Sequence, residues 1–427
     1  MKRNEQIRVH GLSCQLCGAL AALAMFYLNS LYSVAAQTYT ITDLGTLGGR
    51  EASAYGLNAR GQVVGWADTP YSRTVCDPEG CVTYFIHHAF LWTPDTPNGT
   101  VGTMEDLGGS SGTHSYSEAR GVNNHGDVIG TFLWENGSAV KNAPGGYAIN
   151  DAGEILVGSN IWQNGVYYPL GGFGSNVSGG YGINGFGQVV GEFRLTGDPN
   201  QRAHAFLWTP TMPNATNGTM IDLGTLGLFG EAYASGINPQ GQVVGTSYSS
   251  DPFQGHAFVW TPTTPNGTNG SMTDLGPGIA FAINASGVIV GEGGWCPQSP
   301  CSGAVIWRNG VRTDLQGLIP PGSAVGLTLA YAINDSGQIL AWTDGSRRAL
   351  LLTPVAAPRL STPSIQSNSQ LRFTLLGEAG RSYTIQASTN LVNWTALTNF
   401  VSATGTNQFT DSGEPNFSRR FCRAVTP

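Results

Sequence analysis

Residues 55–65 read YGLNARGQVVG, and six later stretches of the chain repeat this phrase. The repeats are RGVNNHGDVIG (120–130), YAINDAGEILVG (147–158), YGINGFGQVVG (181–191), SGINPQGQVVG (235–245), FAINASGVIVG (281–291) and YAINDSGQILA (331–341). In each copy Asn-x-x-Gly separates two short apolar runs, which predicts a strand, a tight turn and a second strand. The asparagines lie 27 to 65 residues apart, so the chain is an internal repeat.

Two further phrases follow in most copies. His-Ala-Phe-Leu-Trp occupies 88–92 and 204–208 and recurs with one change at 256–260, and Asp-Leu-Gly begins at Asp43, Asp106, Asp222 and Asp274. Both phrases predict strands, and helix start and stop signals are absent. Four short strands per copy is the content of one β-propeller blade, and an open β-solenoid is the alternative.

The two ends of the repeat region favour the propeller. Residues 39–49 form an unaccompanied fourth strand, while the seventh copy ends at 349–353 without an Asp-Leu-Gly of its own. An N-terminal strand that completes the last blade would remove exposed sheet edges. We therefore predict an all-β protein, with a seven-bladed propeller over residues 37–356 that is closed by this strand. Six blades remain an alternative, because the second and third copies are short.

The composition agrees with a turn-rich β-protein. The 427 residues include 60 glycines, 41% are hydrophobic, and only 11% are charged, against roughly 25% in ordinary domains. The net charge of −7 argues against nucleic acid or an anionic membrane as a partner. We also expect no cofactor and no bound metal.

The N-terminus has the pattern of a secretory signal peptide. Lys2, Arg3 and Arg8 precede an apolar stretch over residues 16–31, and small residues end at Ala36. We predict cleavage after Ala36, secretion to the cell surface or medium, and no membrane insertion of the mature chain. A retained membrane anchor is the alternative.

The cysteines fit an oxidising compartment. Cys76 with Cys81, and Cys296 with Cys301, have C-x4-C spacing and predict two local disulfides, with a four-thiolate zinc site as the alternative. Cys422 is left over near the C-terminus.

A second module follows the repeat. Residues 357–366 have linker composition, and period-two runs at 371–375, 383–387, 394–397 and 421–425 predict a small antiparallel β-sandwich over residues 367–427. This module is similar to the short β-module that ends many secreted bacterial proteins.

The three recurring phrases resemble the HAF-repeat proteins of bacteria, which are described as probable extracellular repeat proteins. The resemblance covers most of residues 39–352, although copies two, three, six and seven lack His-Ala-Phe. It implies an extracellular location and a repeat fold rather than a reaction.

Most recurring polar and aromatic residues are interpreted as structural. Equivalent histidines of separate blades lie far apart, so we expect His88, His204 and His256 each to bond within its own blade, for instance to the aspartate of Asp-Leu-Gly. The tryptophans that end the third strands are expected to pack between blades. Glu192 and Glu292 should face the central opening, where an acid/base role is a minor alternative.

Function is expected on the loops between second and third strands, because unique loops on a rigid scaffold commonly bind ligands. These loops are long at residues 66–87, 192–203, 246–255 and 292–302. The candidate ligand-binding residues are Trp66, Tyr71, Tyr84, Phe193, Arg194, Tyr248 and Trp295. We expect a non-catalytic protein that binds an extracellular glycan or protein; the alternatives are a polysaccharide hydrolase or lyase and a structural envelope or adhesion protein.

Overall fold

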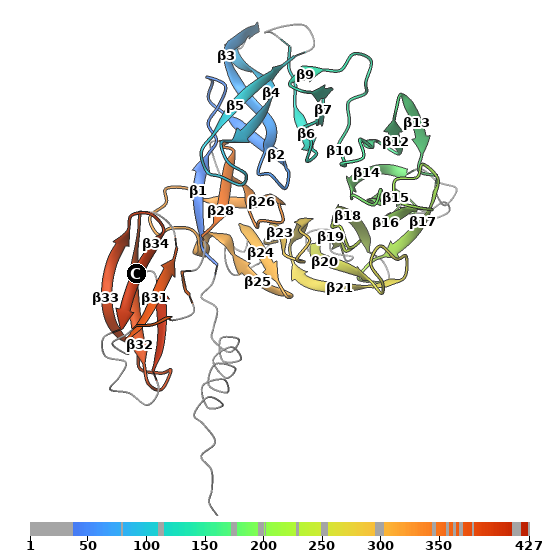
Figure 1. Ribbon diagram of the computed structural model, residues 1–427. Helices are drawn as coiled ribbons and strands as arrows, with labels where there is room; N and C mark the ends of the chain where they lie inside the picture. The colour runs from blue at the N-terminus through green and yellow to red at the C-terminus, as the bar shows by residue number, and fades with distance from the viewer. Residues whose placement is uncertain are drawn as a thin grey trace, which may run out of the picture. The chain divides into compact units, whose positions relative to one another are not determined.

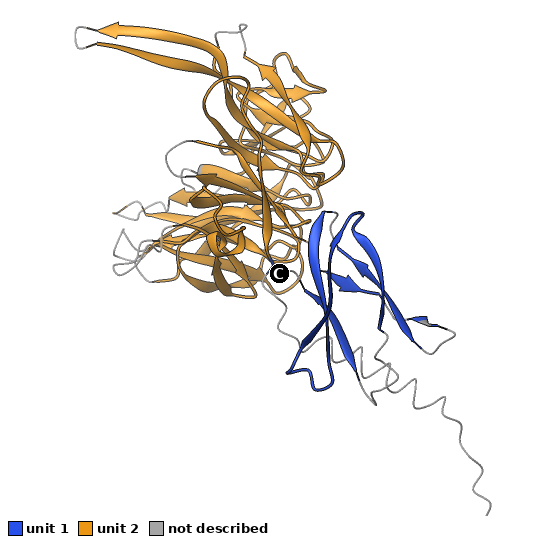
Figure 2. Cartoon of the chain, turned by 90° about the vertical axis from the view of Figure 1, so that its left-hand side faces the viewer, with its two compact units in different colours: residues 1–37, 356–427 blue, residues 38–355 orange. Residues whose placement is uncertain are grey.

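The computed structural model describes residues 37–427 except 78–79, 110–114, 172–176, 195–199, 201, 228–229, 249–254, 295–302, 344–346, 356–357, 362–363, 367–369, 378–379, 412–419 and 426–427. The predicted signal peptide and the Cys296–Cys301 pair therefore lie outside the described residues. The chain forms two compact units, residues 38–355 and a smaller unit that contains residues 356–427 (Figures 1 and 2). In the described part of the chain, no helix has the length and apolar character needed to cross a membrane.

The larger unit is all-β, and its described residues form seven four-stranded antiparallel sheets. Sheet 1 contains β2 (Ala52–Leu57), β3 (Val63–Asp77), β4 (Gly80–Pro94) and β5 (Gly102–Gly108). Sheet 2 contains β6 (Ala119–Val122), β7 (Val128–Gly130), β8 (Leu133–Glu135) and β9 (Ser138–Ala139). Sheet 3 contains β10 (Ala148–Ile149), β11 (Ile155–Val157), β12 (Asn160–Gln163) and β13 (Val166–Pro169). Sheet 4 contains β14 (Val177–Ile183), β15 (Val189–Arg194), β16 (Ala203–Pro210) and β17 (Gly218–Gly224).

The remaining three sheets follow the same order of strands. Sheet 5 contains β18 (Glu231–Ile237), β19 (Val243–Tyr248), β20 (Gly255–Pro262) and β21 (Gly270–Pro277). Sheet 6 contains β22 (Ile279–Ile283), β23 (Ile289–Glu292), β24 (Ala304–Arg308) and β25 (Val311–Asp314), followed by a 3-10 turn, η1 (Leu315–Leu318). Sheet 7 contains β26 (Leu327–Ile333), β27 (Ile339–Thr343), β28 (Leu350–Pro354) and β1 (Tyr39–Asp43). Each copy of the repeat, including the short second and third copies, thus contributes to a four-stranded sheet.

The N-terminal strand pairs with the end of the repeat region. β1 lies antiparallel to β28, with Tyr39 opposite Pro354 and Asp43 opposite Leu350. The pairing expected from the orphan fourth strand is therefore present. This pairing brings the first and the last strand of the larger unit, in sequence order, into one sheet.

The repeated asparagine holds each turn and links it to the next sheet. In Asn238, Oδ1 accepts hydrogen bonds from the backbone N–H of Gln240 and Gln242, at 3.1 and 2.9 Å. Its Nδ2 donates to Gln242 Oε1 at 2.8 Å and to the backbone oxygen of Asn284 at 3.1 Å. The side chain supplies hydrogen-bond partners to the buried turn of its own sheet and to one carbonyl of the next sheet. Buried polar groups require such partners.

The same bond to the next sheet occurs at all seven asparagines. The donor–acceptor pairs are Asn58–Asn123, Asn123–Asn150, Asn150–Asn184, Asn184–Asn238, Asn238–Asn284, Asn284–Asn334 and Asn334–Asn58. The last pair returns to the first asparagine across 276 residues of sequence, at 3.1 Å. The seven turns are therefore linked in a cycle of hydrogen bonds.

The apolar core lies between successive sheets rather than within any one of them. Trp208 of sheet 4 shares a buried cluster with Leu156 and Ile161 of sheet 3. Trp134 Nε1 donates to the carbonyl of Leu107 in sheet 1 at 3.0 Å. The expectation that these tryptophans pack between sheets is confirmed at both positions.

The smaller unit consists of two antiparallel sheets. One contains β29 (Arg359–Leu360), β30 (Ser364–Ile365), β31 (Leu371–Leu376) and β34 (Thr406–Asp411), and the other contains β32 (Arg381–Ser388), β33 (Thr395–Ser402) and β35 (Phe421–Val425). Leu375 from the first sheet and Tyr383 and Ile385 from the second share one buried cluster. Cys422 lies half-buried in β35, with its thiol sulfur 3.8 Å from Asp411 Oδ2.

Candidate functional site

The longest expected loop, residues 66–87, is a hairpin. β3 and β4 continue far beyond the other strands of sheet 1 and form an arm that projects from the larger unit (Figure 2). Cys76 and Cys81 form a disulfide across its tip, which confirms this pairing and excludes these two thiols from a zinc site. Tyr71 and Tyr84 are exposed on the arm, at 43% and 52%.

Two of the expected loop aromatics are instead buried in strands. Trp66 is 6% exposed and Phe193 is 1% exposed, so the expectation of an exposed ring is wrong at both positions. The strands continue through these residues, and side chains on both faces of each strand are buried there. Trp66 Nε1 donates to the hydroxyl of Tyr55 at 3.1 Å, and the ring of Phe193 lies 5.8 Å from that of His204.

The other candidate residues do not gather on the arm. Arg194 is exposed at the end of β15, and Tyr248 is half-buried at the end of β19, with its ring 5.9 Å from that of Tyr233. Trp295 lies outside the described residues. Tyr248 contacts Tyr233 of the first strand β18, whereas Tyr71 and Tyr84 belong to the arm.

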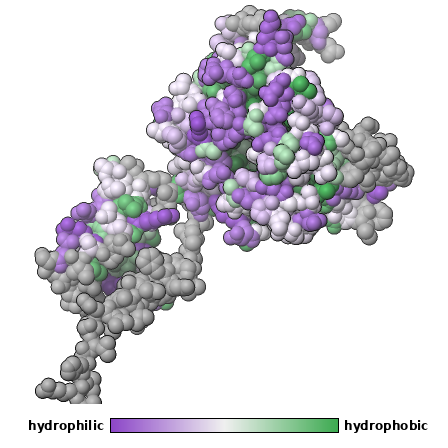
Figure 3. Space-filling view, turned by 45° about the vertical axis from the view of Figure 1, so that its right-hand side comes forward, coloured by the Kyte–Doolittle hydropathy of each residue, from purple (hydrophilic) through white to green (hydrophobic). Residues whose placement is uncertain are grey.

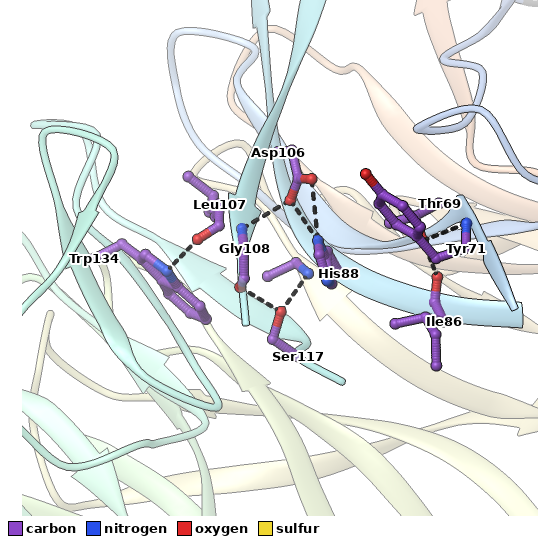
Figure 4. A network of polar contacts seen from close by, with 10 residues as sticks. Thr69, Tyr71, Ile86, His88, Asp106, Leu107, Gly108, Ser117 and Trp134 are labelled. Atoms are coloured by element: carbon purple, nitrogen blue, oxygen red, sulfur yellow. Dashed lines mark hydrogen bonds and ion pairs between the residues drawn. The ribbon is translucent and has the colours of Figure 1, made fainter. Parts of the chain in front are cut away.

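The recurring histidines have a structural role. His88 Nδ1 lies 2.9 Å from Asp106 Oδ1, and the same carboxylate oxygen accepts from the backbone N–H of Gly108 at 2.8 Å (Figure 4). His204 pairs with Asp222, and His256 pairs with Asp274, each at 2.9 Å. The expected histidine–aspartate bond is therefore confirmed in all three copies that carry His-Ala-Phe. In sheet 7, Arg348 stands at the histidine position and forms an ion pair with Asp43.

A β-bulge interrupts the first strand of six sheets at one equivalent position. In sheet 1 the register passes from Ala54 to Gly56, so Tyr55 has no partner in the ladder. A bulge of this kind bends a strand and redirects a side chain. The residues skipped are Tyr55, Arg120, Tyr181, Ser235, Phe281 and Tyr331.

These first strands meet one another. β2, β6, β10, β14, β18, β22 and β26 each contact the next in that order, and β26 also contacts β2 (Figure 1). Each bulged residue precedes its turn asparagine by three positions. The bulged side chains therefore lie near one another on neighbouring first strands, unlike the histidines on the third strands.

Ring contacts join four of the six bulged residues into a belt. The ring of Tyr331 lies 5.6 Å from those of Phe281, Tyr55 and Trp342. The guanidinium of Arg120 lies 5.2 Å from the ring of Tyr55. On its other side the same guanidinium lies 5.7 Å from the ring of Tyr147, the residue just before β10. We call this set of residues, Phe281, Tyr331, Trp342, Tyr55, Arg120 and Tyr147, the aromatic belt.

A pocket opens beside Arg120 and Tyr147. It has a volume of about 310 Å³ and lies between sheets 2 and 3, where the loops after the second strands are shortest. Arg120 also forms an ion pair with Glu118 at 2.9 Å. The pocket is lined by Glu118, Arg120, Gly130, Thr131, Gly145, Gly146, Tyr147 and Val157.

Carboxylates accompany the tyrosines of sheets 4 and 5. The hydroxyl of Tyr181 donates to Glu192 Oε1 at 3.2 Å, and that of Tyr233 donates to Glu231 Oε2 at 2.9 Å. Burial and the neighbouring Glu192 raise the pKa of Tyr181 to about 12, so its hydroxyl stays protonated. Burial likewise raises the pKa of Glu292 in sheet 6.

The repeated phrase contains a signal for this site. An aromatic residue stands three positions before the turn asparagine in five of the seven copies, and recurrence favours an architectural role. That inference holds for third strands, because equivalent residues on the third strands of different sheets lie far apart. First strands meet, so their repeated residues converge. No protein-family model and no curated protein matches this chain.

Proposed function

We propose that this chain is a secreted seven-bladed β-propeller that binds an extracellular glycan, without catalysis, at the opening between its first strands. In this proposal each four-stranded sheet of the larger unit is one blade. The cycle of asparagine bonds and the β1–β28 pairing support a closed ring, because both join the last copy to the first. The disulfide of the arm supports export, since such bonds persist in oxidising compartments.

The aromatic belt is the observation that carries the glycan assignment. Carbohydrate sites combine aromatic ring faces with a few oriented polar groups, because a sugar ring has apolar faces and a polar edge. The belt offers tyrosine, phenylalanine and tryptophan rings with Arg120 among them. On the face seen in Figure 3, hydrophobic residues lie in small groups among hydrophilic ones, which suits a polar ligand better than a large apolar partner.

The direction of the strands supports a position of the belt on the loop face. Each first strand runs towards its asparagine turn, and each second strand runs away from it. Trp66 and Trp342, which follow the Val-Val-Gly or Leu-Ala run of their second strands, therefore lie beyond the turns, towards the loops that join second and third strands. The proposed site thus opens on the face expected from the sequence, but it is built by first strands rather than by the loops.

A polysaccharide array tests the proposal. Purified mature chain, residues 37–427, is expected to show saturable binding to at least one glycan and to release no new reducing ends on incubation. Release of products would replace binding by a hydrolase or lyase activity. Absence of binding to every glycan would overturn the proposal and favour a protein partner or a scaffold.

A further inference from the structure

One part of the opening differs in chemistry from the aromatic belt. Glu192, Thr246 and Glu292 occupy the same position on the second strands of sheets 4, 5 and 6, directly after Val-Gly. At this position Trp66 and Trp342 touch the bulged tyrosines of their own sheets, and Glu192 does so through its bond to Tyr181. We call Glu192, Thr246 and Glu292 the acidic arc.

Two side chains of the arc are buried with polar atoms left unsatisfied. Glu192 is 8% exposed and Thr246 is 3% exposed. Among the residues that the structure describes, neither Oε2 of Glu192 nor Oγ1 of Thr246 has a hydrogen-bond partner. Buried acceptors without donors destabilise a fold, so a donor that reached these two atoms at adjacent sheets would stabilise it.

The charge around the arc favours a cation. Three carboxylates, those of Glu192, Glu231 and Glu292, act on the tyrosines beside the arc, whereas Arg194 acts on Tyr181 and Tyr233 alone. The hydroxyls of Tyr181 and Tyr233 are already committed to Glu192 and Glu231. The rings of Tyr233 and Tyr248 stand beside the arc, and tyrosine faces attract cations.

We infer that the acidic arc binds the protonated amine of an amino-sugar residue within the glycan, an inference that rests on the proposed function. A primary ammonium is compact and has three donors, which match Glu192 Oε2, Thr246 Oγ1 and the carboxylate of Glu292. A hydroxyl or an N-acetyl group can donate a single hydrogen bond to a carboxylate, but it has no positive charge to pair with the arc. The same opening would therefore discriminate free amines from acetylated ones.

Three oligosaccharides of equal length and linkage test this inference by calorimetric titration: a glucosamine oligosaccharide, its fully N-acetylated form and a glucose oligosaccharide. The wild-type chain should bind the glucosamine form about tenfold or more tightly than either of the others. Glu192→Gln and Glu292→Gln should each remove most of this preference. Glu135→Gln, at an exposed residue that ends β8 in sheet 2, is the matched control and should retain the preference.

The outcomes separate the inference from the proposed function. Equal affinity for the free and acetylated forms would overturn the amine site while leaving glycan binding in place. Absence of binding to all three and to every glycan on the array would overturn both. Glu292 is only half-buried, so Glu292→Gln tests the arc even if Glu192→Gln fails to fold. Retention of the full preference in a folded Glu292→Gln variant would also overturn the inference.

Discussion

The residue four positions after each turn asparagine decides whether the asparagine side chain has a hydrogen-bond acceptor within its own turn. Gln62, Gln188, Gln242 and Gln338 occupy it in four sheets, and each side-chain oxygen accepts from the asparagine Nδ2. Glu154 occupies it in sheet 3, fully buried. Its Oε2 accepts from Asn150 Nδ2 at 2.6 Å, whereas its Oε1 has no partner among the described residues.

Replacing Glu154 by glutamine should therefore stabilise the protein. Burial raises the pKa of Glu154, so the folded state holds this proton to higher pH than the unfolded state does. The wild type loses stability as the pH rises above the ordinary pKa of a glutamate, and the glutamine variant does not. We expect Glu154→Gln to raise the free energy of unfolding by about 1 kcal/mol at neutral pH and to have little effect in acid.

Thermal unfolding across this pH range measures the difference, with Glu135→Gln as the exposed control. A gain in stability that was the same in acid and at neutral pH would contradict the assignment of the effect to titration of Glu154.

At the scale of elements, the sequence predicted most strands because its signals are local. Asn-x-x-Gly located the turns, the C-x4-C spacing located the disulfide of the arm, and the unpaired Asp-Leu-Gly of Asp43 located the partner of β28. The bonds between asparagines of successive sheets could not be predicted, because each acceptor lies in another copy of the repeat. The burial of the Trp66 side chain could not be predicted, because a strand that extends into an arm has the same composition as a long loop.

The β1–β28 pairing makes a direct prediction about the two ends of the larger unit. Thr40 and Thr353 are opposite one another in the register, and directly paired residues of antiparallel strands have Cα separations suited to a disulfide. The double variant Thr40→Cys/Thr353→Cys should form this bond under oxidising conditions. It should raise the free energy of unfolding by about 2–4 kcal/mol.

The control pair is Thr40→Cys/Thr328→Cys, because β26 is separated from β1 by β27 and β28. Its two thiols should stay reactive in a thiol titration. Reactive thiols in the Thr40/Thr353 variant would contradict the pairing.

In the whole molecule, a residue that recurs in several sheets either stays apart from its equivalents or meets them, according to its strand. On third strands, the repeated His88, His204 and His256 each pair within one sheet and remain separate. On first strands, the repeated aromatics meet and form the belt. The candidate site could therefore be located only after the arrangement of the sheets was known, although most of its residues stand in the repeated phrase.

In the proposed function, the ligand binds at the belt rather than on the arm. Tyr147 of the belt and Tyr84 of the arm are both 52% exposed, so alanine at either position removes a ring of equal exposure. The affinity of each variant for the glycan that the array identifies is the measurement to make. We predict that Tyr147→Ala weakens glycan binding about tenfold, as expected for the loss of one stacked ring. Tyr84→Ala should leave the affinity unchanged. Loss of binding in Tyr84→Ala with unchanged affinity in Tyr147→Ala would contradict this prediction and place the site on the arm.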